Sequence, residues 1–134
     1  MKILGIGVDI VENSRISKSL KNKIFIKRIF SNSEILIAEK VKNKKNYYSK
    51  RYAAKEAFAK SIGIGFRNNL NFKDISVIND KLGKPSFTIT KKIKTIIKEQ
   101  FNLMMSLIPT YVHKNVLMCQ LVSLFESGHQ KIPY

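Results

Sequence analysis

The sequence is poor in cysteine, in arginine and in acidic residues, and each shortage narrows what the chain can be. The single cysteine, Cys119, cannot form an internal disulfide, and only two histidines accompany it, which disfavours a zinc site. No apolar run approaches the roughly 20 residues that a membrane-spanning helix needs. The apolar start over 3–8 is broken by Asp9 and lacks a small-residue cleavage site, so no signal peptide is predicted. We therefore expect a cytoplasmic, single-domain protein.

The shortage of acids leaves a strong positive charge. Nine Asp and Glu stand against 25 Lys and Arg, which gives the 134-residue chain a formal net charge of +16. Only Arg15, Arg28, Arg51 and Arg67 are arginines, whereas proteins that read DNA bases rely on the forked arginine side chain. Residues 40–60 are strongly basic and contain one acid. Such a segment attracts an anion: a phosphate-rich small molecule, an acidic protein or a nucleic acid.

Hydrophobic periodicity predicts a mixture of helices and strands. Residues 3–10 are typical of a short buried strand, and 46–62 of the longest helix, with alanines and aromatic residues at helical spacing. Ser31 and Glu34 form a predicted capping box for a helix over 32–42. A strand pair is predicted over 75–78 and 85–89, followed by a helix over 90–101 that Thr90 caps. Two further strands are predicted over 103–108 and 116–125. One domain is expected over 1–126, with a loose tail over 127–134.

Two acids stand out by their positions. Asp9 ends an apolar strand, and a buried carboxylate is costly unless it is paired or binds a metal. Glu56 is the only acid in a basic helix and lies one turn before Lys60. One interpretation is two structural salt bridges, Asp9 with a nearby lysine and Glu56 with Lys60. The other joins both carboxylates as ligands of Mg²⁺, with Lys60 meeting a metal-bound phosphate; spacing alone leaves both open.

Four sequence blocks together are more specific than any single residue. They are GIGVDIVENSR at 5–15, RIFSNSE at 28–34, RYAAKEAFAKSIGIG at 51–65 and GKPSF at 83–87. In order and spacing these blocks resemble the bacterial holo-acyl-carrier-protein synthases, the small phosphopantetheinyl transferases. The resemblance implies transfer of phosphopantetheine from coenzyme A to a serine of apo acyl carrier protein, for fatty acid biosynthesis, with release of adenosine 3′,5′-bisphosphate.

The resemblance also implies roles for individual residues. Asp9 and Glu56 match the family's Mg²⁺ ligands, and Lys60 matches the lysine that contacts the phosphates and assists proton transfer, so these three are the expected catalytic residues. The contacts to coenzyme A are expected from Arg51, Lys55, Lys60, Ser61, Gly63, Gly65 and Pro85. The acidic carrier protein is expected to dock on Arg15, Lys21 and Arg28. The base that takes the serine proton, a water on the metal or a carboxylate, stays open.

The implied fold is α+β, a small domain with an antiparallel sheet packed against a long helix, assembled as a trimer with coenzyme A between subunits. A net charge of +16 suits polyanionic coenzyme A and an acidic carrier protein, with no nucleic acid or membrane as partner. The C-terminal part departs from the family: 105–110 lacks its second Ser and its His, and His113 is not expected to replace the latter. Two alternatives are a basic nucleic-acid-binding module and an inactive member that binds coenzyme A or carrier protein only.

Overall fold

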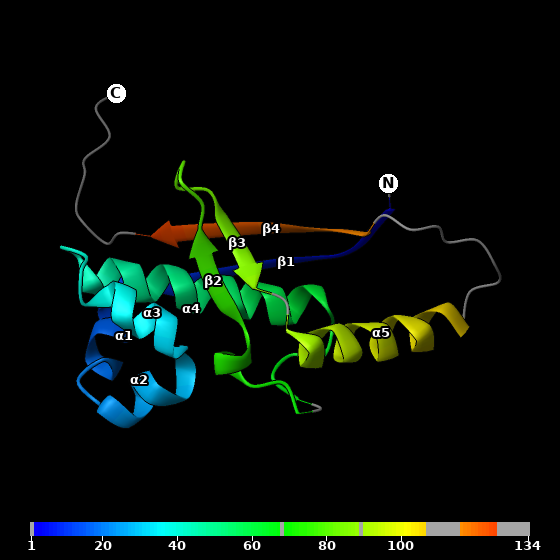
Figure 1. Cartoon of the computed structure of the whole chain (residues 1–134), viewed down its shortest axis with the longest axis horizontal. Helices are drawn as coiled ribbons and strands as arrows, with labels where there is room; N and C mark the ends of the chain where they lie inside the picture. Colours follow the sequence, from blue (N-terminus) through cyan, green and yellow to red (C-terminus); the bar gives the residue numbers. More distant parts are fainter. Residues whose placement is uncertain (1, 68, 89, 107–115, 126–134) are drawn as a thin grey trace.

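The computed structural model describes residues 2–67, 69–88, 90–106 and 116–125 (Figure 1). Strands and helices are mixed along these residues, which confirms the expected α+β class. In chain order they are β1 (Lys2–Glu12), α1 (Asn13–Ser19), α2 (Lys23–Ile29), α3 (Asn32–Ala38), α4 (Lys44–Ser61), the 3₁₀ turn η1 (Phe72–Asp74), β2 (Ser76–Asn79), β3 (Pro85–Thr88), α5 (Lys91–Ser106) and β4 (Val116–Phe125).

The strands form two pairs. β2 and β3 make the antiparallel hairpin that the sequence predicts, with Val77 opposite Phe87. β1 and β4 pair in parallel, with Asp9 opposite Val122. The expected antiparallel arrangement therefore holds for the hairpin only, because the sequence pattern locates a strand without fixing its direction beside another. Figure 1 shows α4 lying along the β1–β4 pair, with the hairpin beside it.

Gly5 and Gly7 let β1 lie directly against α4. A Cβ atom on Gly5 would fall 1.8 Å from the backbone oxygen of Ser61, and one on Gly7 would fall 1.8 Å from that of Ala57. Neither contact has room for a side chain. Because alternate residues of a strand share a face, Asp9 continues the face that the two glycines turn toward α4.

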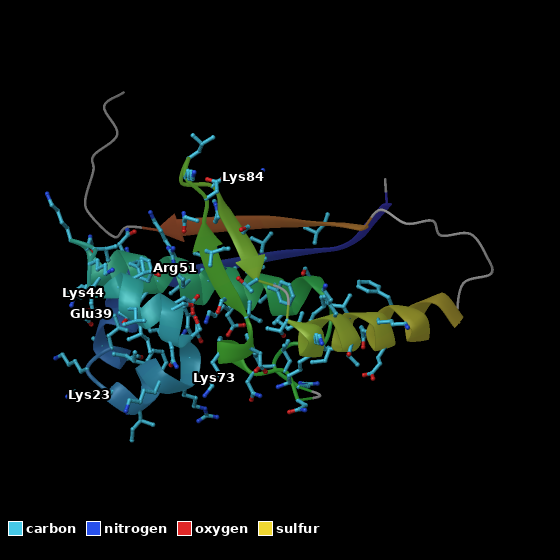
Figure 2. The ribbon with its side chains drawn as sticks, in the orientation of Figure 1. Lys23, Glu39, Lys44, Arg51, Lys73 and Lys84 are labelled. Atoms are coloured by element: carbon cyan, nitrogen blue, oxygen red, sulfur yellow. The ribbon has the colours of Figure 1, made fainter. Side chains whose placement is uncertain are left out.

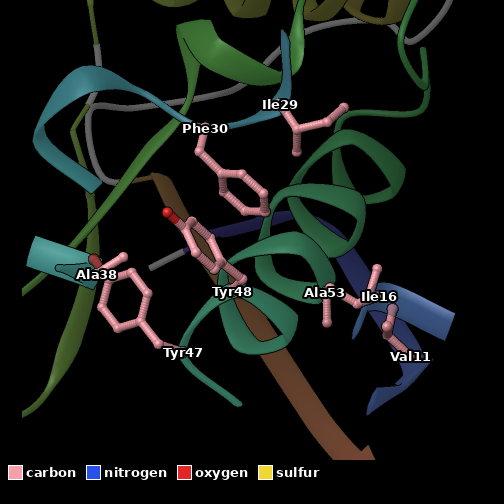
Figure 3. Packing of buried hydrophobic residues seen from close by; sticks show 8 residues of the cluster. All are labelled: Val11, Ile16, Ile29, Phe30, Ala38, Tyr47, Tyr48 and Ala53. Carbon is pink, nitrogen blue, oxygen red and sulfur yellow. The ribbon is translucent and has the colours of Figure 1, made fainter. Parts of the chain in front are cut away.

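Two apolar clusters support α4, one along each half. Around its first half, residues of α1, α2 and α3 pack on the helix, and the ring of Phe30 lies 4.5 Å from that of Tyr48, centroid to centroid (Figure 3). Around its second half, Phe58 packs against Phe87 of β3 at 4.9 Å, and Ile93 of α5 is completely buried. The long helix is thereby fixed along its whole length.

A buried ion pair joins α3, α4 and β2. Glu34 completes the predicted capping box with Ser31, and its side chain and that of Lys55 have no exposed surface. Lys55 Nζ donates to Glu34 Oε2 at 2.6 Å and to the Ile29 carbonyl oxygen at 2.8 Å, while Glu34 Oε1 accepts from the Val77 backbone N–H at 3.0 Å. These hydrogen bonds offset the desolvation of both charges, so Lys55 acts as a structural residue.

The C-terminal part of the chain differs from the sequence-based prediction at one element, and several of its residues are not described by the structure. Residues 103–106 complete α5, so a strand beginning at residue 103 is wrong, whereas the strand expected over 116–125 is confirmed as β4. His113, residues 107–110 of the atypical 105–110 stretch, and the expected tail over 127–134 lie outside the described residues. Among the described residues, no helix is both long and apolar enough to span a bilayer.

Candidate active site

Asp9 lies where β1 touches α4, and its two carboxylate oxygens have different surroundings. Oδ1 accepts a hydrogen bond from Lys60 Nζ at 2.6 Å. Oδ2 is buried and has no hydrogen-bond partner among the described residues. The Asp9 side chain is only 12% exposed, so this oxygen is removed from bulk water without compensation. A bare, buried carboxylate oxygen of this kind is suited to a cation.

Glu56 approaches the same place from α4. The pKa of Glu56 is raised above its ordinary value, first by desolvation and then by the negative charge of Asp9. The nearby Tyr52 hydroxyl and the positive charges of Lys60 and Arg15 lower the pKa of Glu56 and so act in the opposite direction. The influence of Asp9 shows that the strand and the helix bring two carboxylates together, an arrangement that is common at functional sites.

Lys60, one turn after Glu56 on α4, interacts with both acids. Its ammonium binds Asp9 rather than forming the intrahelical pair with Glu56 that is one of the sequence-based interpretations, although its charge still lowers the pKa of Glu56. The Lys60 side chain is 51% exposed, so the pair contributes little to stability. Its exposure leaves the ammonium accessible to an anion arriving from solvent.

The chemistry of these side chains fits a magnesium ion. Asp9 and Glu56 supply carboxylate oxygens, and Mg²⁺ typically takes one or two protein carboxylates and completes its shell with water and phosphate. Among the described residues no group of three or more His, Cys, Asp or Glu side chains is assembled for a metal. The donor set is therefore too small and too hard for a closed zinc site.

Tyr52 is one of the aromatic residues at helical spacing on α4, and it lies one turn before Glu56. Its hydroxyl is close enough to the Glu56 carboxylate to lower the pKa of that group. The pKa of Tyr52 is raised, first by desolvation and then by the negative charge of Glu56. The signal in the sequence is the four-residue spacing between Tyr52 and Glu56, which places both on one helix face.

A family model described as the 4′-phosphopantetheinyl transferase superfamily matches residues 5–112. The chain belongs to this superfamily. A holo-[acyl-carrier-protein] synthase of Pelagibacter ubique (strain HTCC1062) is 74% identical over 103 residues, which cover 77% of this chain and 80% of that relative. These matches confirm the family that the four sequence blocks indicate.

Solved structures of phosphopantetheinyl transferases share the fold. Holo-[acyl-carrier-protein] synthase from Neisseria meningitidis matches with a TM-score of 0.69 and 39% identity, over 75% of this chain and 82% of that one. A holo-(acyl-carrier-protein) synthase from Bacillus anthracis str. Ames, in complex with CoA (3′,5′-ADP), matches with a TM-score of 0.61 and 38% identity, over 66% of this chain and 76% of that one.

In this transferase, the first group of residues expected to contact coenzyme A lies at the end of α4, next to Lys60. Gly63 and Gly65 have φ values of 75° and 59°, the left-handed region that favours glycine, and a Cβ on either would meet nothing within 4 Å. The space beside both glycines is thus open, while their backbone N–H groups donate to the Lys60 and Ala59 carbonyl oxygens of α4. Ser61 is buried and donates its hydroxyl to the Phe58 carbonyl oxygen, so its side chain is not presented to a ligand.

The second group lies beside the β2–β3 hairpin. Arg51, which is labelled in Figure 2, donates a hydrogen bond from Nη2 to Asn79 Oδ1. Pro85 is the residue opposite Asn79 in the hairpin. Ten residues of α4 separate Arg51 from Ser61, about 15 Å along a helix. Lys55, between them in sequence, is held in the core by Glu34 and presents no surface, so the structure does not support it as a contact to coenzyme A.

The residues expected to bind the carrier protein are exposed. Arg15 is on α1, Lys21 follows that helix, and Arg28 is on α2. Arg15 is also near enough to Glu56 to lower its pKa. The basic surface formed by these three side chains therefore begins beside the two carboxylates.

Proposed function

We propose that this chain transfers phosphopantetheine from coenzyme A to a serine of apo acyl carrier protein, at the site formed by Asp9, Glu56 and Lys60. The observation that carries the proposal is the convergence of two carboxylates, one with a bare buried oxygen, beside a half-exposed lysine. It occurs in a chain that is 74% identical to a holo-[acyl-carrier-protein] synthase.

Each of the three side chains has a distinct task in this reaction. Asp9 and Glu56 hold the divalent cation, expected to be Mg²⁺, which when bound neutralises charge on the pyrophosphate of coenzyme A. Lys60 contacts the same phosphates from the exposed side. As the serine oxygen bonds to phosphorus and the bond to adenosine 3′,5′-bisphosphate breaks, negative charge grows on the departing oxygen, and the ammonium stabilises it there.

The carrier protein docks on the basic surface of Arg15, Lys21 and Arg28. Charges at the rim of an interface mainly set the association rate and its salt dependence. We therefore expect that Arg15→Glu with Arg28→Glu weakens carrier-protein binding much more than coenzyme A binding, as measured by surface plasmon resonance and calorimetry. Equal losses for both substrates would show that these arginines serve the nucleotide or the fold instead.

Assembly as a homotrimer is the expected form of the enzyme. The face of β1 that points away from α4 carries Ile6, Val8 and Ile10, which are 64%, 45% and 57% exposed. An apolar face of this kind supports burial against a second copy of the chain. The two separated groups of expected coenzyme A contacts are also consistent with a site completed by a neighbouring subunit. A role in fatty acid biosynthesis, a cytoplasmic location and the lack of nucleic-acid or membrane partners stay predictions.

Mass spectrometry of apo acyl carrier protein tests the proposed function directly. Incubation with this protein, coenzyme A and Mg²⁺ is expected to add one phosphopantetheine group, and Asp9→Ala is expected to abolish the addition while circular dichroism shows a retained fold. Glu39→Ala, which removes an exposed acid paired with Lys44, is the matched control and should remain active.

The same assay separates the alternatives. Binding of coenzyme A without any mass increase would identify an inactive family member. Salt-dependent binding of RNA or DNA without transfer, and without a magnesium requirement, would identify a basic nucleic-acid-binding module.

A further inference from the structure

The buried pair of Glu34 and Lys55 joins four elements at one point. Glu34 Oε2 accepts hydrogen bonds from the Ser31 backbone N–H at 2.8 Å and from Lys55 Nζ at 2.6 Å. The other oxygen of Glu34, Oε1, accepts from the Val77 backbone N–H at 3.0 Å. Lys55 Nζ also donates to the carbonyl oxygen of Ile29 at 2.8 Å. Two side chains thereby tie the end of α2, the start of α3 and the strand β2 to α4.

The bond to Ile29 fixes the end of the helix that carries Arg28. Ile29 is the last residue of α2, and the carbonyl groups in the last turn of a helix have no partner within that helix. Lys55 supplies both a donor and a positive charge to this end, where the helix dipole is negative. Arg28, the residue before Ile29, is one of the three residues expected to bind the carrier protein. The place of Arg28 relative to α4 therefore depends on Lys55.

The bond to Val77 fixes the β2–β3 hairpin against α4 in the same way. Val77 is two residues before Asn79 in β2, and Asn79 accepts the hydrogen bond from Arg51 Nη2. Pro85 lies opposite Asn79 on β3. The residues beside the hairpin that are expected to contact coenzyme A are therefore held in place relative to Glu56, which lies further along α4.

Stability by itself does not account for a charged pair at this point. Exchange of a buried ion pair for apolar side chains of similar volume often leaves a protein equally stable or more stable. Apolar packing has no preferred direction, whereas a hydrogen bond needs a donor–acceptor distance of about 2.7–3.2 Å and a nearly straight angle. The pair of Glu34 and Lys55 thus specifies how four elements are oriented, which apolar contacts would define less sharply.

We propose that Glu34 and Lys55 are positioning residues, which place the carrier-protein surface at the end of α2 and the coenzyme A contacts beside the hairpin relative to the carboxylates on β1 and α4. This inference rests on the proposed transfer reaction. The serine oxygen and the phosphorus atom react only when they are held close and in line. A misplacement of about 1 Å, caused by a residue far from the chemistry, can lower the rate about 100-fold.

The double variant Glu34→Gln with Lys55→Met tests this role, because it removes both charges and nearly keeps the size of both side chains. A glutamine can still complete the capping box with Ser31, so the start of α3 retains its cap. Steady-state transfer assays, run well below the melting temperature of the variant, should show kcat/KM lowered at least about 10-fold for coenzyme A and for apo acyl carrier protein. A role in stability alone predicts normal kinetics at that temperature.

Asp74→Asn with Lys92→Met is the matched control, and it should keep normal kinetics. It removes the ion pair between η1 and α5, two elements that carry none of the expected site residues. The asparagine keeps an acceptor for the Asn71 backbone N–H, which donates to Asp74 in the unmodified chain.

Binding of Mn²⁺, used as the probe ion for the cation site, shows whether that site is intact. It is measured from the electron paramagnetic resonance signal of the free ion in the absence of substrates. Both double variants should bind Mn²⁺ as the unmodified chain does, because β1 and α4 bring Asp9 and Glu56 together through their own close contact. Loss of Mn²⁺ binding in Glu34→Gln with Lys55→Met would contradict a role confined to the two substrates.

Glu34→Asp is a second variant, which keeps both charges and draws the carboxylate back by one methylene group, so that it cannot reach Lys55 and Val77 together. It should lose kcat/KM for both substrates and retain Mn²⁺ binding. Normal kinetics in either variant, beside an active unmodified chain, would overturn the positioning role alone. If circular dichroism shows that neither variant folds, the pair is a requirement of the fold and the positioning role is overturned as well. An unmodified chain that transfers no phosphopantetheine would overturn the proposed function, and the inference with it.

Discussion

At the scale of single residues, Asp9, Glu56 and Lys60 are arranged for charge handling rather than for stability. Asp9 keeps one oxygen buried and unpartnered within the described part of the chain, and desolvation raises the pKa of Glu56. Lys60 offsets only part of this, from a half-exposed position. Buried carboxylates with incomplete charge compensation are typical of sites where side chains are placed to bind a ligand.

Replacing Glu56 with glutamine should therefore stabilise the metal-free protein at neutral pH. Because the folded-state pKa of Glu56 is raised, its ionisation lowers stability once the pH exceeds the ordinary value near 4.5, and the loss grows until the folded-state pKa is passed. In the presence of a chelator, Glu56→Gln should raise the melting temperature at pH 7, with a gain that shrinks toward pH 4.

The exposed acid Glu99 on α5 supplies the control for that experiment. Glu99→Gln should leave the melting temperature nearly unchanged at both pH values. A Glu56→Gln variant that melts below the unmodified chain at pH 7 would show that the Glu56 carboxylate stabilises the fold.

Lys60 is expected to act in the transition state. Lys60→Ala should lower kcat about 100-fold, as loss of one preorganised charge-stabilising contact commonly does, with a smaller change in the KM for coenzyme A. The exposed lysine Lys50, on the same helix, gives the control variant Lys50→Ala, which should keep normal kinetics. Steady-state assays over a range of coenzyme A concentrations measure both constants, and a near-normal kcat in Lys60→Ala would remove this residue from the catalytic set.

At the scale of elements, the site depends on how closely β1 approaches α4. Gly5, Gly7 and Asp9 share one face of the strand, and the backbone oxygens of Ala57 and Ser61 fill the space where side chains of the two glycines would be. A larger separation between strand and helix would move Asp9 away from Glu56. The glycines thus contribute to the site although they carry no chemical group.

Gly7→Ala tests this dependence. The new methyl group would fall 1.8 Å from the Ala57 oxygen, which is backbone and cannot rotate away. We expect a loss of more than about 3 kcal/mol in the free energy of unfolding, together with weakened Mn²⁺ binding.

Gly83→Ala is an informative comparison, because Gly83 lies in the hairpin turn with φ 85° and open space around it. Gly83→Ala should lower the stability of the fold only through the strain of an alanine at positive φ, and it should leave the affinity for Mn²⁺ unchanged. Denaturant unfolding and metal titration of both variants provide the measurements, and full metal affinity in Gly7→Ala would contradict the role given to the close contact.

At the scale of the whole molecule, the chain presents different chemistry on different surfaces. The basic surface of Arg15, Lys21 and Arg28 begins beside the carboxylates, while the outer face of β1 is apolar. A +16 charge opposes self-association through repulsion, so a stable oligomer has to form over the apolar face rather than the basic one.

Val8→Lys should dissociate the expected trimer, because it places a charge in the centre of that apolar face without touching α4. Size-exclusion chromatography with light scattering should give three times the 15.4 kDa chain mass for the unmodified protein and a single chain mass for the variant. Leu82→Lys, at the 95% exposed hairpin tip, controls for the loss of an exposed apolar residue. A monomeric unmodified protein, or a trimeric Val8→Lys, would contradict the trimer.

The sequence by itself determined those features that depend on interactions between residues close together in the chain. The Ser31–Glu34 capping box, the long helix and the hairpin depend on near neighbours in the chain, and the structure has all three. The four sequence blocks likewise indicated the family, because their spacing is written in the sequence. The positions of Asp9 and Glu56 marked them as unusual before any contact was visible.

Only the tertiary structure decided which groups meet. Lys60 had a sequence neighbour in Glu56, yet its ammonium binds Asp9, 51 residues away. Lys55 lies in the same basic helix as Lys60, but the helix face that it occupies turns inward to Glu34, so it became a buried structural residue. The parallel pairing of β1 with β4 and the aromatic stack around Tyr52 also join distant segments. Local propensity carries no information on such contacts, because they form only when several elements pack at once.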